Sequence, residues 1–520
     1  MRNLWMLVLV FSAQAVFGQQ LDKYWVFFTD KDGVTFDPYS YFDPKAIENR
    51  ILNEIPLDDI TNYPVRTDYV AALTSSVEEV KMTTRWFNGA VCMATEDQIN
   101  QVRQFQFVKK VEKVFTAENM VLAEYNETDY KVDLSDSYKE LLDRQTDIMG
   151  GQLMAEKGFN GEGVRVAIFD AGFPTVDTNP CFDHMRKNGK IKATYDFVKK
   201  KEFVYSYSSH GTFVLSNVGG MIEGRKMGLA TEAEFILART EMGMREPFAE
   251  EENWLAAAEW ADKNGATVIN SSLGYTHHRY FYNDMDGTSY VAKAANMAAR
   301  KGILVVNAAG NEGSGDWKFI GTPADADSVL SIGGIDPKTD TKVGFSSFGP
   351  TYDKRMKPNV SAYGWAIGAG EKGIKKSAGT SFASPLVCGF VACARQAFPE
   401  MKTMDLFHKI EESGSLYPYF DYGHGYGIPQ AERLFGEENA VDVSYEIIQE
   451  DGVYYASLGE DYGCGGVIYM HIADPNNVLR EWSVKTVEAS KIKMFSTSAA
   501  KKGDTVRVCY NGKIVTLTVK

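Results

Sequence analysis

The spacing of hydrophobic and polar residues divides this 520-residue chain into four segments. The first has a positive charge at Arg2, an apolar run over residues 4–10, and small residues up to Gly18. This pattern is typical of a secretory signal peptide that is cut after Gly18. The apolar run is shorter than the ~18 residues that a membrane span requires, and no later segment is long and apolar enough. We therefore expect a secreted, periplasmic or cell-surface protein without a membrane span.

The second segment, residues 19–143, begins as a small α+β unit and ends as a polar stretch. Short alternating runs predict strands, and amphipathic runs predict helices, one of them capped by Thr95. The predicted strands are 23–28, 80–87, 90–94 and 107–115, and the predicted helices are 42–53 and 95–104. Residues 117–143 are charged and have no clear period, so we expect an exposed linker that proteases can cut.

In the third segment, residues 144–436, short apolar strands alternate with amphipathic helices. Strands separated by helices of this length predict an α/β domain with a mostly parallel sheet and helices on both faces. The clearest strands are 164–169, 234–238, 267–270 and 303–307, and the clearest helices are 252–264 and 289–301. Residues 437–520 are strand-rich with turns between the strands, which predicts a small all-β domain.

Composition and charge narrow the classes of function. Hydrophobic residues make up 44% of the chain, which argues against disorder, and the formal charge of −14 argues against nucleic-acid binding. The six cysteines are too few for a disulfide framework. Cys388 and Cys393 share one apolar helix and are expected to be packing residues. Cys464 and Cys509 could pair after export or remain thiols, since sequence does not fix their geometry.

Two polar residues stand where a turn meets a regular element. Asp170 ends the predicted strand 164–169, and the carboxyl ends of parallel strands are where open α/β sheets carry their sites. Taken alone, such an aspartate more often begins a turn. His210 lies between serines and Gly211, directly before an apolar helix, and is a candidate general base. An isolated histidine is more often structural or exposed.

Ser381 is presented at the start of a helix. Gly379 allows a tight turn before it, and Pro385 suits a first helical turn. Free backbone N–H groups and the helix dipole at such a position favour a developing oxyanion. A serine there is more often a simple helix cap, so the argument depends on the set of residues. A serine hydroxyl needs a base, and the base needs an orienting carboxylate. Asn311, after the strand 303–307, could direct its amide at the oxyanion.

Five stretches make the set specific, namely AIFDAG, SSHGTFV, VINSSLG, VVNAAGNEG and GTSFASP. In their order and approximate spacing, residues 145–436 resemble the subtilisin-like serine peptidase family, whose triad has the order Asp, His, Ser. The resemblance implies that Asp170 orients His210, that His210 is the general base and acid, and that Ser381 is the nucleophile. Asn311 and the Ser381 N–H would stabilise the oxyanion. The implied substrate-binding residues are Ser272, Leu273, Gly274, Ala309 and Gly310.

The second segment resembles the propeptide of the same family, through WFNGAV, a helix and then VKKVEKV. The resemblance implies a zymogen that its own propeptide inhibits until residues 117–143 are cut. Ala171 departs from the family pattern, which has Ser or Thr there, and Phe382 replaces the usual Met. Neither change removes a catalytic group.

These residues favour a serine endopeptidase that cuts proteins or peptides through an acyl-enzyme. An inactive subtilisin fold used for binding or adhesion is the main alternative, and peptide ligation by the same acyl-enzyme is another. The chemistry requires no cofactor. Calcium often accompanies the family, but the sequence gives no convincing ligand set for it and no zinc-binding spacing.

Overall fold

The computed structural model describes residues 20–114, 136–242, 249–277, 279–438, 444–459, 463 and 465–520. By their contacts these residues form two units. The first unit consists of residues 20–36 and 60–114, and the second of residues 37–59 and everything from 136 onward. The predicted signal peptide and residues 117–135 of the predicted linker lie outside the described residues. Within the described part of the chain, no helix is both long and apolar enough to cross a membrane.

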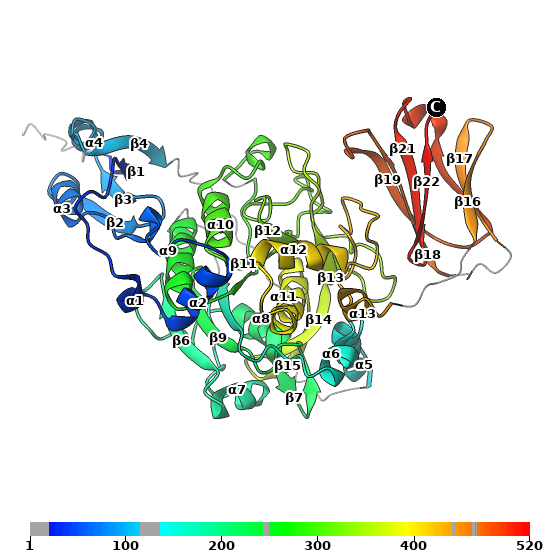
Figure 1. Cartoon of the computed structure of the whole chain (residues 1–520), viewed down its shortest axis with the longest axis horizontal. Coiled ribbons are helices and arrows are strands. Elements are labelled where there is room, and N and C mark those ends of the chain that lie inside the picture. The colour runs from blue at the N-terminus through cyan, green and yellow to red at the C-terminus, as the bar shows by residue number, and fades with distance from the viewer. Residues whose placement is uncertain are drawn as a thin grey trace, which may run out of the picture. The chain divides into compact units, whose positions relative to one another are not determined.

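The first unit is a four-stranded antiparallel sheet with two helices (Figure 1). Thr95 caps the second helix as predicted: its Oγ1 accepts the Gln98 N–H at 3.2 Å, and the Gln98 side chain accepts the Thr95 N–H at 2.9 Å. The strands run in the order β2-β3-β1-β4. The elements are β1 (Asp22–Phe28), α3 (Thr67–Thr74), β2 (Glu79–Thr84), β3 (Gly89–Ala94), α4 (Glu96–Val102) and β4 (Val108–Val114).

The second unit is built around a seven-stranded parallel sheet, as the alternation of strands and helices predicted. Its strand order is β13-β12-β11-β10-β5-β9-β6. The strands are β5 (Arg165–Asp170), β6 (Ile191–Asp196), β9 (Glu234–Arg239), β10 (Val268–Ser271), β11 (Leu304–Ala308), β12 (Val329–Ile335) and β13 (Val360–Tyr363). Every residue of β5, β10, β11, β12 and β13 is buried, which is why none of these strands alternates between polar and apolar residues along its length.

Helices cover both faces of this sheet. The helices α8 (His210–Gly219) and α11 (Thr380–Ala397) pack against each other and against the sheet. The helices α9 (Ala249–Lys263) and α10 (Tyr290–Arg300) form a second pair, visible side by side in Figure 1. Cys388 and Cys393 are buried free thiols on α11, so their predicted packing role is confirmed.

The C-terminal part is all-β, as predicted, and consists of two small antiparallel sheets. One has the order β16-β17-β20 and the other β19-β18-β21-β22. The strands are β16 (Tyr445–Glu450), β17 (Val453–Leu458), β18 (Val467–Ala473), β19 (Leu479–Thr486), β20 (Lys491–Ser496), β21 (Thr505–Tyr510) and β22 (Lys513–Thr518). Cys509 is a buried thiol, and Cys464 lies outside the described residues, so their pairing stays a prediction.

The predicted linker does not reach 143 as an exposed stretch. Residues from 136 form the helix α5 (Asp136–Asp147), and Leu142 of this helix is fully buried in the main core. The buried Gln145 side chain donates to the carbonyls of Met227 and Ile367 and accepts the Ile367 N–H at 2.9 Å. The helix is therefore part of the second unit.

Candidate active site

The carboxyl end of β5 places Asp170 in a fully buried position. Its Oδ1 accepts the Ala171 N–H at 2.8 Å, which fixes the carboxylate without a neighbouring hydroxyl. The departure at Ala171 therefore leaves a backbone hydrogen bond to this carboxylate in place.

His210 is the first residue of α8, and its ring faces Asp170. The Nδ1 atom lies 2.9 Å from each carboxylate oxygen of Asp170. This contact needs a close approach of the helix start, and Gly211 permits it, because a Cβ there would lie 2.9 Å from the Cβ of Asp170. Because Nδ1 contacts the carboxylate, the other ring nitrogen, Nε2, is on the side of the imidazole away from Asp170. A carboxylate commonly orients a histidine in this way.

Ser381 lies in the first turn of α11 and is 5% exposed. Its hydroxyl donates to the Ser272 carbonyl at 3.2 Å, and the Ser272 hydroxyl donates to the Ser381 carbonyl at 3.0 Å. The ring of Phe382, the next residue, lies 5.4 Å from the His210 ring. The structure therefore brings Asp170, His210 and Ser381 to the same end of the sheet.

Asn311 follows β11 and faces the start of α11. Its Oδ1 accepts the Thr380 N–H at 2.9 Å and the Thr380 hydroxyl at 3.0 Å. That hydroxyl also accepts the Gly310 N–H at 3.2 Å. Because two donors hold Oδ1, the Nδ2 donor of Asn311 is directed away from Thr380. The sequence did not indicate that Thr380, which directly precedes Ser381, would hold the Asn311 side chain.

Two of the predicted substrate-binding residues, Ser272 and Gly310, contact the start of α11. Ser272 is hydrogen-bonded to Ser381, and the Leu273 carbonyl accepts the Asn307 side-chain amide at 2.9 Å. Gly310 is tied to Thr380, which directly precedes Ser381.

A buried ion pair lies beneath Asp170 and was not predicted. Arg239, the register neighbour of Asp170 on β9, donates through Nε to the Ala171 carbonyl at 3.0 Å. Its guanidinium pairs with Asp196 at 3.1 Å, and both side chains are almost fully buried. No local sequence signal links positions 196 and 239, because the pairing of β6 with β9 creates the contact.

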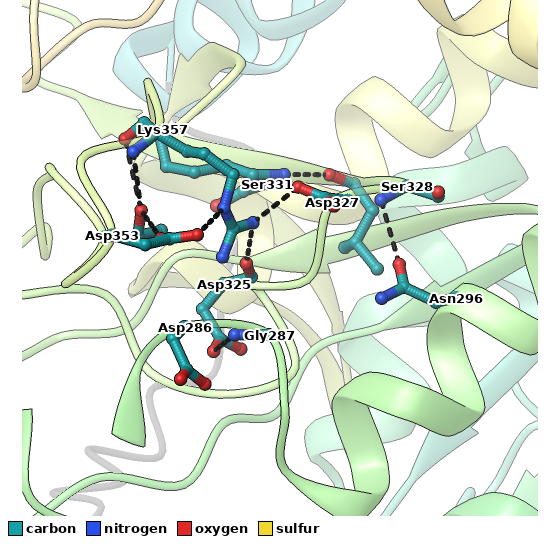
Figure 2. A network of polar contacts seen from close by, with 12 residues as sticks. Asp286, Gly287, Asn296, Asp325, Asp327, Ser328, Ser331, Asp353 and Lys357 are labelled. Carbon is teal, nitrogen blue, oxygen red and sulfur yellow. Dashed lines mark hydrogen bonds and ion pairs between the residues drawn. The ribbon is translucent and has the colours of Figure 1, made fainter. Parts of the chain in front are cut away.

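A polar network surrounds Asp325, between β11 and β12 (Figure 2). Thr322 pairs with Tyr275 through backbone hydrogen bonds of 2.9 and 3.1 Å. The loop that follows it is held by Asp325, whose Oδ2 accepts the Gly287 N–H at 2.8 Å. Burial raises the pKa of Asp325 to about 6 and lowers the pKa of Lys357 to about 7. The network therefore joins the segment after Thr322 to the loop at Gly287.

The arrangement fits nucleophilic acyl transfer. A carboxylate that orients an imidazole, next to a serine at a helix start and an amide donor, supplies the groups this reaction needs. Among the described residues, no group of three or more His, Cys, Asp or Glu side chains is arranged to hold a metal ion. The fold and these residues together define a serine peptidase with a parallel α/β sheet.

The comparisons with known proteins give the family. The model of the Subtilase family matches residues 161–427, and the model of the Peptidase S8 propeptide domain, Bacteroidota, matches residues 23–130. The chain therefore belongs to the subtilase family, and it is a subtilisin-like serine protease with a propeptide domain.

Its relatives include known proteases. Subtilisin DY of Bacillus licheniformis is 28% identical over 276 residues, which cover 52% of this chain and 90% of that protein. Serine protease AprX of Bacillus subtilis (strain 168) is 28% identical over 317 residues, covering 55% and 69%. The crystal structure of the epidermin leader peptide processing serine protease of Staphylococcus aureus superposes with a TM-score of 0.54 at 16% identity. That match covers 81% of this chain and 100% of that one, and it concerns the fold alone.

Proposed function

We propose that this protein is a secreted serine endopeptidase, made as a zymogen, in which Asp170, His210 and Ser381 form the catalytic triad. The observation that carries the proposal is the contact of His210 Nδ1 with both oxygens of the buried Asp170, beside Ser381 at the start of α11. An isolated helix cap would need neither a base nor an orienting carboxylate.

In the first half-reaction, Ser381 Oγ attacks the carbonyl carbon of a peptide bond, and His210 Nε2 accepts the hydroxyl proton. The hydroxyl must first turn from the Ser272 carbonyl, to which it donates here, toward His210. Asn311 Nδ2 and the Ser381 N–H stabilise the oxyanion. When the C–N bond breaks, His210 returns the proton to the leaving amine and the acyl group stays on Ser381.

In the second half-reaction, water gives a proton to His210 and attacks the ester of the acyl-enzyme. The ester bond breaks, the carboxylic acid product leaves, and His210 returns the proton to Ser381. Asp170 remains a carboxylate throughout and stabilises the imidazolium that forms twice in each cycle. We propose the residues Ser272, Leu273, Gly274, Ala309 and Gly310 as the walls that hold the substrate backbone and the side chain next to the cut bond.

The zymogen part of the proposal rests on the propeptide domain match and on the packing of α5. Because α5 is packed into the core from Leu142 onward, we place the activating cut N-terminal to residue 136. The predicted signal peptide, residues 1–18, supports export. Mass analysis of the released propeptide and of the mature protein tests the signal-peptide cut and the activating cut.

The test compares the parent chain with Ser381→Ala in a casein assay and follows the N-terminus of the incubated precursor. We expect activity to fall by about 10⁶-fold, because the nucleophile is lost. We also expect Ser381→Ala to keep its full-length precursor. Ser377→Ala, on the neighbouring strand β15 (Gly373–Ala378), is the matched control and should keep parental activity. Equal activity of Ser381→Ala and the parent would overturn the proposal.

A further inference from the structure

A segment inside the propeptide packs with the catalytic part of the molecule. Residues 37–59 lie between β1 and α3 in the sequence, yet by their contacts they belong to the second unit. They contain two helices, α1 (Pro38–Tyr41) and α2 (Pro44–Leu52), and Asp43 caps α2 by accepting the Lys45 N–H at 2.9 Å. The first unit continues from both ends of this segment. We call residues 37–59 the docking segment.

A buried ion pair joins the docking segment to α9. The Arg50 side chain is fully buried, and its Nη2 donates to both carboxylate oxygens of Asp262, at 2.8 and 2.7 Å. Asp262 lies on α9 and is only 3% exposed. The guanidinium also lies 3.8 Å from the centre of the Phe42 ring. Removing one partner of a buried pair leaves the other charge buried without that counterion, so a change at Arg50 should weaken docking.

The docking segment also supplies hydrogen bonds to the ends of three helices. Asn49 donates to the carbonyls that end α10, at 3.2 Å to Lys301 and 2.9 Å to Gly302. Asn53 accepts the N–H of Thr403, the first residue of α12 (Thr403–Glu412), at 2.8 Å. The Asp43 N–H donates to the Lys263 carbonyl, at the end of α9, at 2.9 Å. The last carbonyls and the first N–H groups of a helix have no partner inside the helix. The docking segment therefore supplies hydrogen-bond partners to backbone groups of the catalytic part.

Two glycines of the catalytic part lie in close contact with the docking segment. Gly302 has a φ of +81°, and a Cβ there would lie 2.6 Å from Asn53 Nδ2 and 2.7 Å from Asn49 Nδ2. Gly265 has a φ of +70°, and a Cβ there would lie 2.8 Å from the Cβ of Lys45. The backbone conformation alone favours glycine at both positions. The absence of a side chain at both also gives the segment its close approach.

This surface lies at the amino end of β5, whereas Asp170 of the predicted triad lies at its carboxyl end. Asp43 pairs with Arg165, the first residue of β5, at 3.0 Å, whereas Asp170 is the last residue of that strand. The first and last of six residues in an extended strand lie about 17 Å apart. The docking segment therefore contacts the opposite end of β5 from Asp170.

We propose that this surface, at the amino end of β5, is a docking site for the propeptide's own residues 37–59, separate from the triad, and that its contacts slow release of the propeptide after the linker has been cut. The proposal rests on the proposed function only in that a cut occurs. Because the segment is continuous with the first unit at residues 36 and 60, its docking keeps that unit at a high effective concentration. Release of the propeptide then requires loss of this contact, as well as cleavage.

The experiment uses the full chain with Ser381→Ala and a recognition sequence for an added specific endopeptidase placed in residues 117–130. After the cut, size-exclusion chromatography and the dissociation rate report whether the two fragments stay together. We expect them to co-elute. Arg50→Met should raise the dissociation rate by about 100-fold, because Asp262 loses its buried counterion. The double change Asn49→Ala with Asn53→Ala should raise it by about 10-fold.

The matched control is Ile51→Ala, which changes an exposed residue of the same helix and should dissociate at the parental rate. Thermal unfolding before the cut shows whether each variant folds. If Arg50→Met does not fold, the asparagine variant carries the test. Immediate separation of the parental fragments would overturn the proposal, as would parental dissociation rates in the folded variants. Self-processing has no part in this assay, since Ser381 is replaced, so a failure here is distinct from a failure of the proposed protease function.

Discussion

At the scale of single residues, the candidate site depends on side chains whose orientation is fixed by neighbours. Oδ1 of Asn311 is held by two donors from Thr380, so the amide has one way to face. Asp170 is held by the Ala171 N–H and by His210. Such fixed groups need little reorganisation when charge develops in a transition state.

The first prediction concerns Asn311. Asn311→Ala should lower kcat by about 100- to 1000-fold and leave KM nearly unchanged, because the lost donor acts on the oxyanion and not on the bound substrate. Steady-state kinetics on a peptide substrate measures both constants. A rise in KM at unchanged kcat would instead assign Asn311 to substrate binding.

Sequence could predict the residues of the site but not all of their supports. Asp170, His210, Ser381 and Asn311 each stand in a short motif with glycine or small residues beside it. The pair of Arg239 with Asp196 has no such motif, because strand pairing brings the two side chains together. Tertiary contacts between distant positions leave no local pattern to find.

At the scale of elements, close helix packing sets the geometry of Ser381. The helix α11 contacts α8, which begins with His210. At Gly389 of α11, a Cβ would lie 2.7 Å from the Val218 carbonyl oxygen of α8. This glycine lets the two helices approach, although helix propensity alone disfavours glycine inside a helix.

The second prediction follows from this contact. Propensity alone would let Gly389→Ala stabilise the protein by about 1 kcal/mol. We expect the opposite, a loss of about 1–3 kcal/mol, because the added methyl group meets the backbone of α8 and cannot be accommodated by a side-chain movement. Denaturant unfolding in the Ser381→Ala background measures the difference. Gly344→Ala, where a Cβ would have open space, is the control, and stabilisation by Gly389→Ala would contradict the packing argument.

The sequence predicted most elements that have a clear hydrophobic pattern, and missed elements without such a pattern. The strands β5, β9, β10 and β11 are apolar runs and were predicted within one residue of their observed ends. β6 carries lysine, threonine and aspartate, and β12 contains two glycines, so neither has a strand signature. Arg50 stands on a helix rich in polar residues, a position that in sequence resembles an exposed surface, and only the docked structure reveals its burial.

At the scale of the whole chain, the C-terminal β part is joined to the catalytic part by specific contacts. His471 of β18 donates through Nδ1 to the Phe420 carbonyl at 2.7 Å, and its ring stacks on Tyr419 with a centroid distance of 4.7 Å. Trp482 of β19 packs where Gly423 has no side chain. The alternating strands predicted this domain, but its contacts with the 417–426 loop could not be inferred, since they join separate domains.

The third prediction concerns acid stability. Burial lowers the pKa of His471 to about 4, against about 6.5 for an exposed histidine; the charge of Arg507 acts in the same direction, and that of Asp421 opposes it. Between these values the unfolded chain binds the proton and the folded chain does not. Stability should therefore fall as the pH drops from 6.5 to 4, with a total loss of about 3 kcal/mol below pH 4.

Thermal unfolding of the Ser381→Ala protein between pH 4 and 7 measures this loss. His471→Gln keeps a donor for the Phe420 carbonyl but does not titrate, so its unfolding temperature should depend less on pH. His408→Gln, at an exposed position, is the control and should behave as the parent. The same pH dependence in His471→Gln as in the parent would assign the acid loss to other groups.

The docking segment has a consequence for how the enzyme responds to its surroundings. In the proposed zymogen, the precursor is inactive at any dilution, because its covalently attached inhibitor cannot leave. Once the linker is cut, only non-covalent contacts remain, that of Arg50 with Asp262 among them, and release of the propeptide obeys mass action. The cut enzyme would then remain inhibited at high protein concentration and become active on dilution. Dilution, as well as proteolysis, would then determine when the enzyme is active.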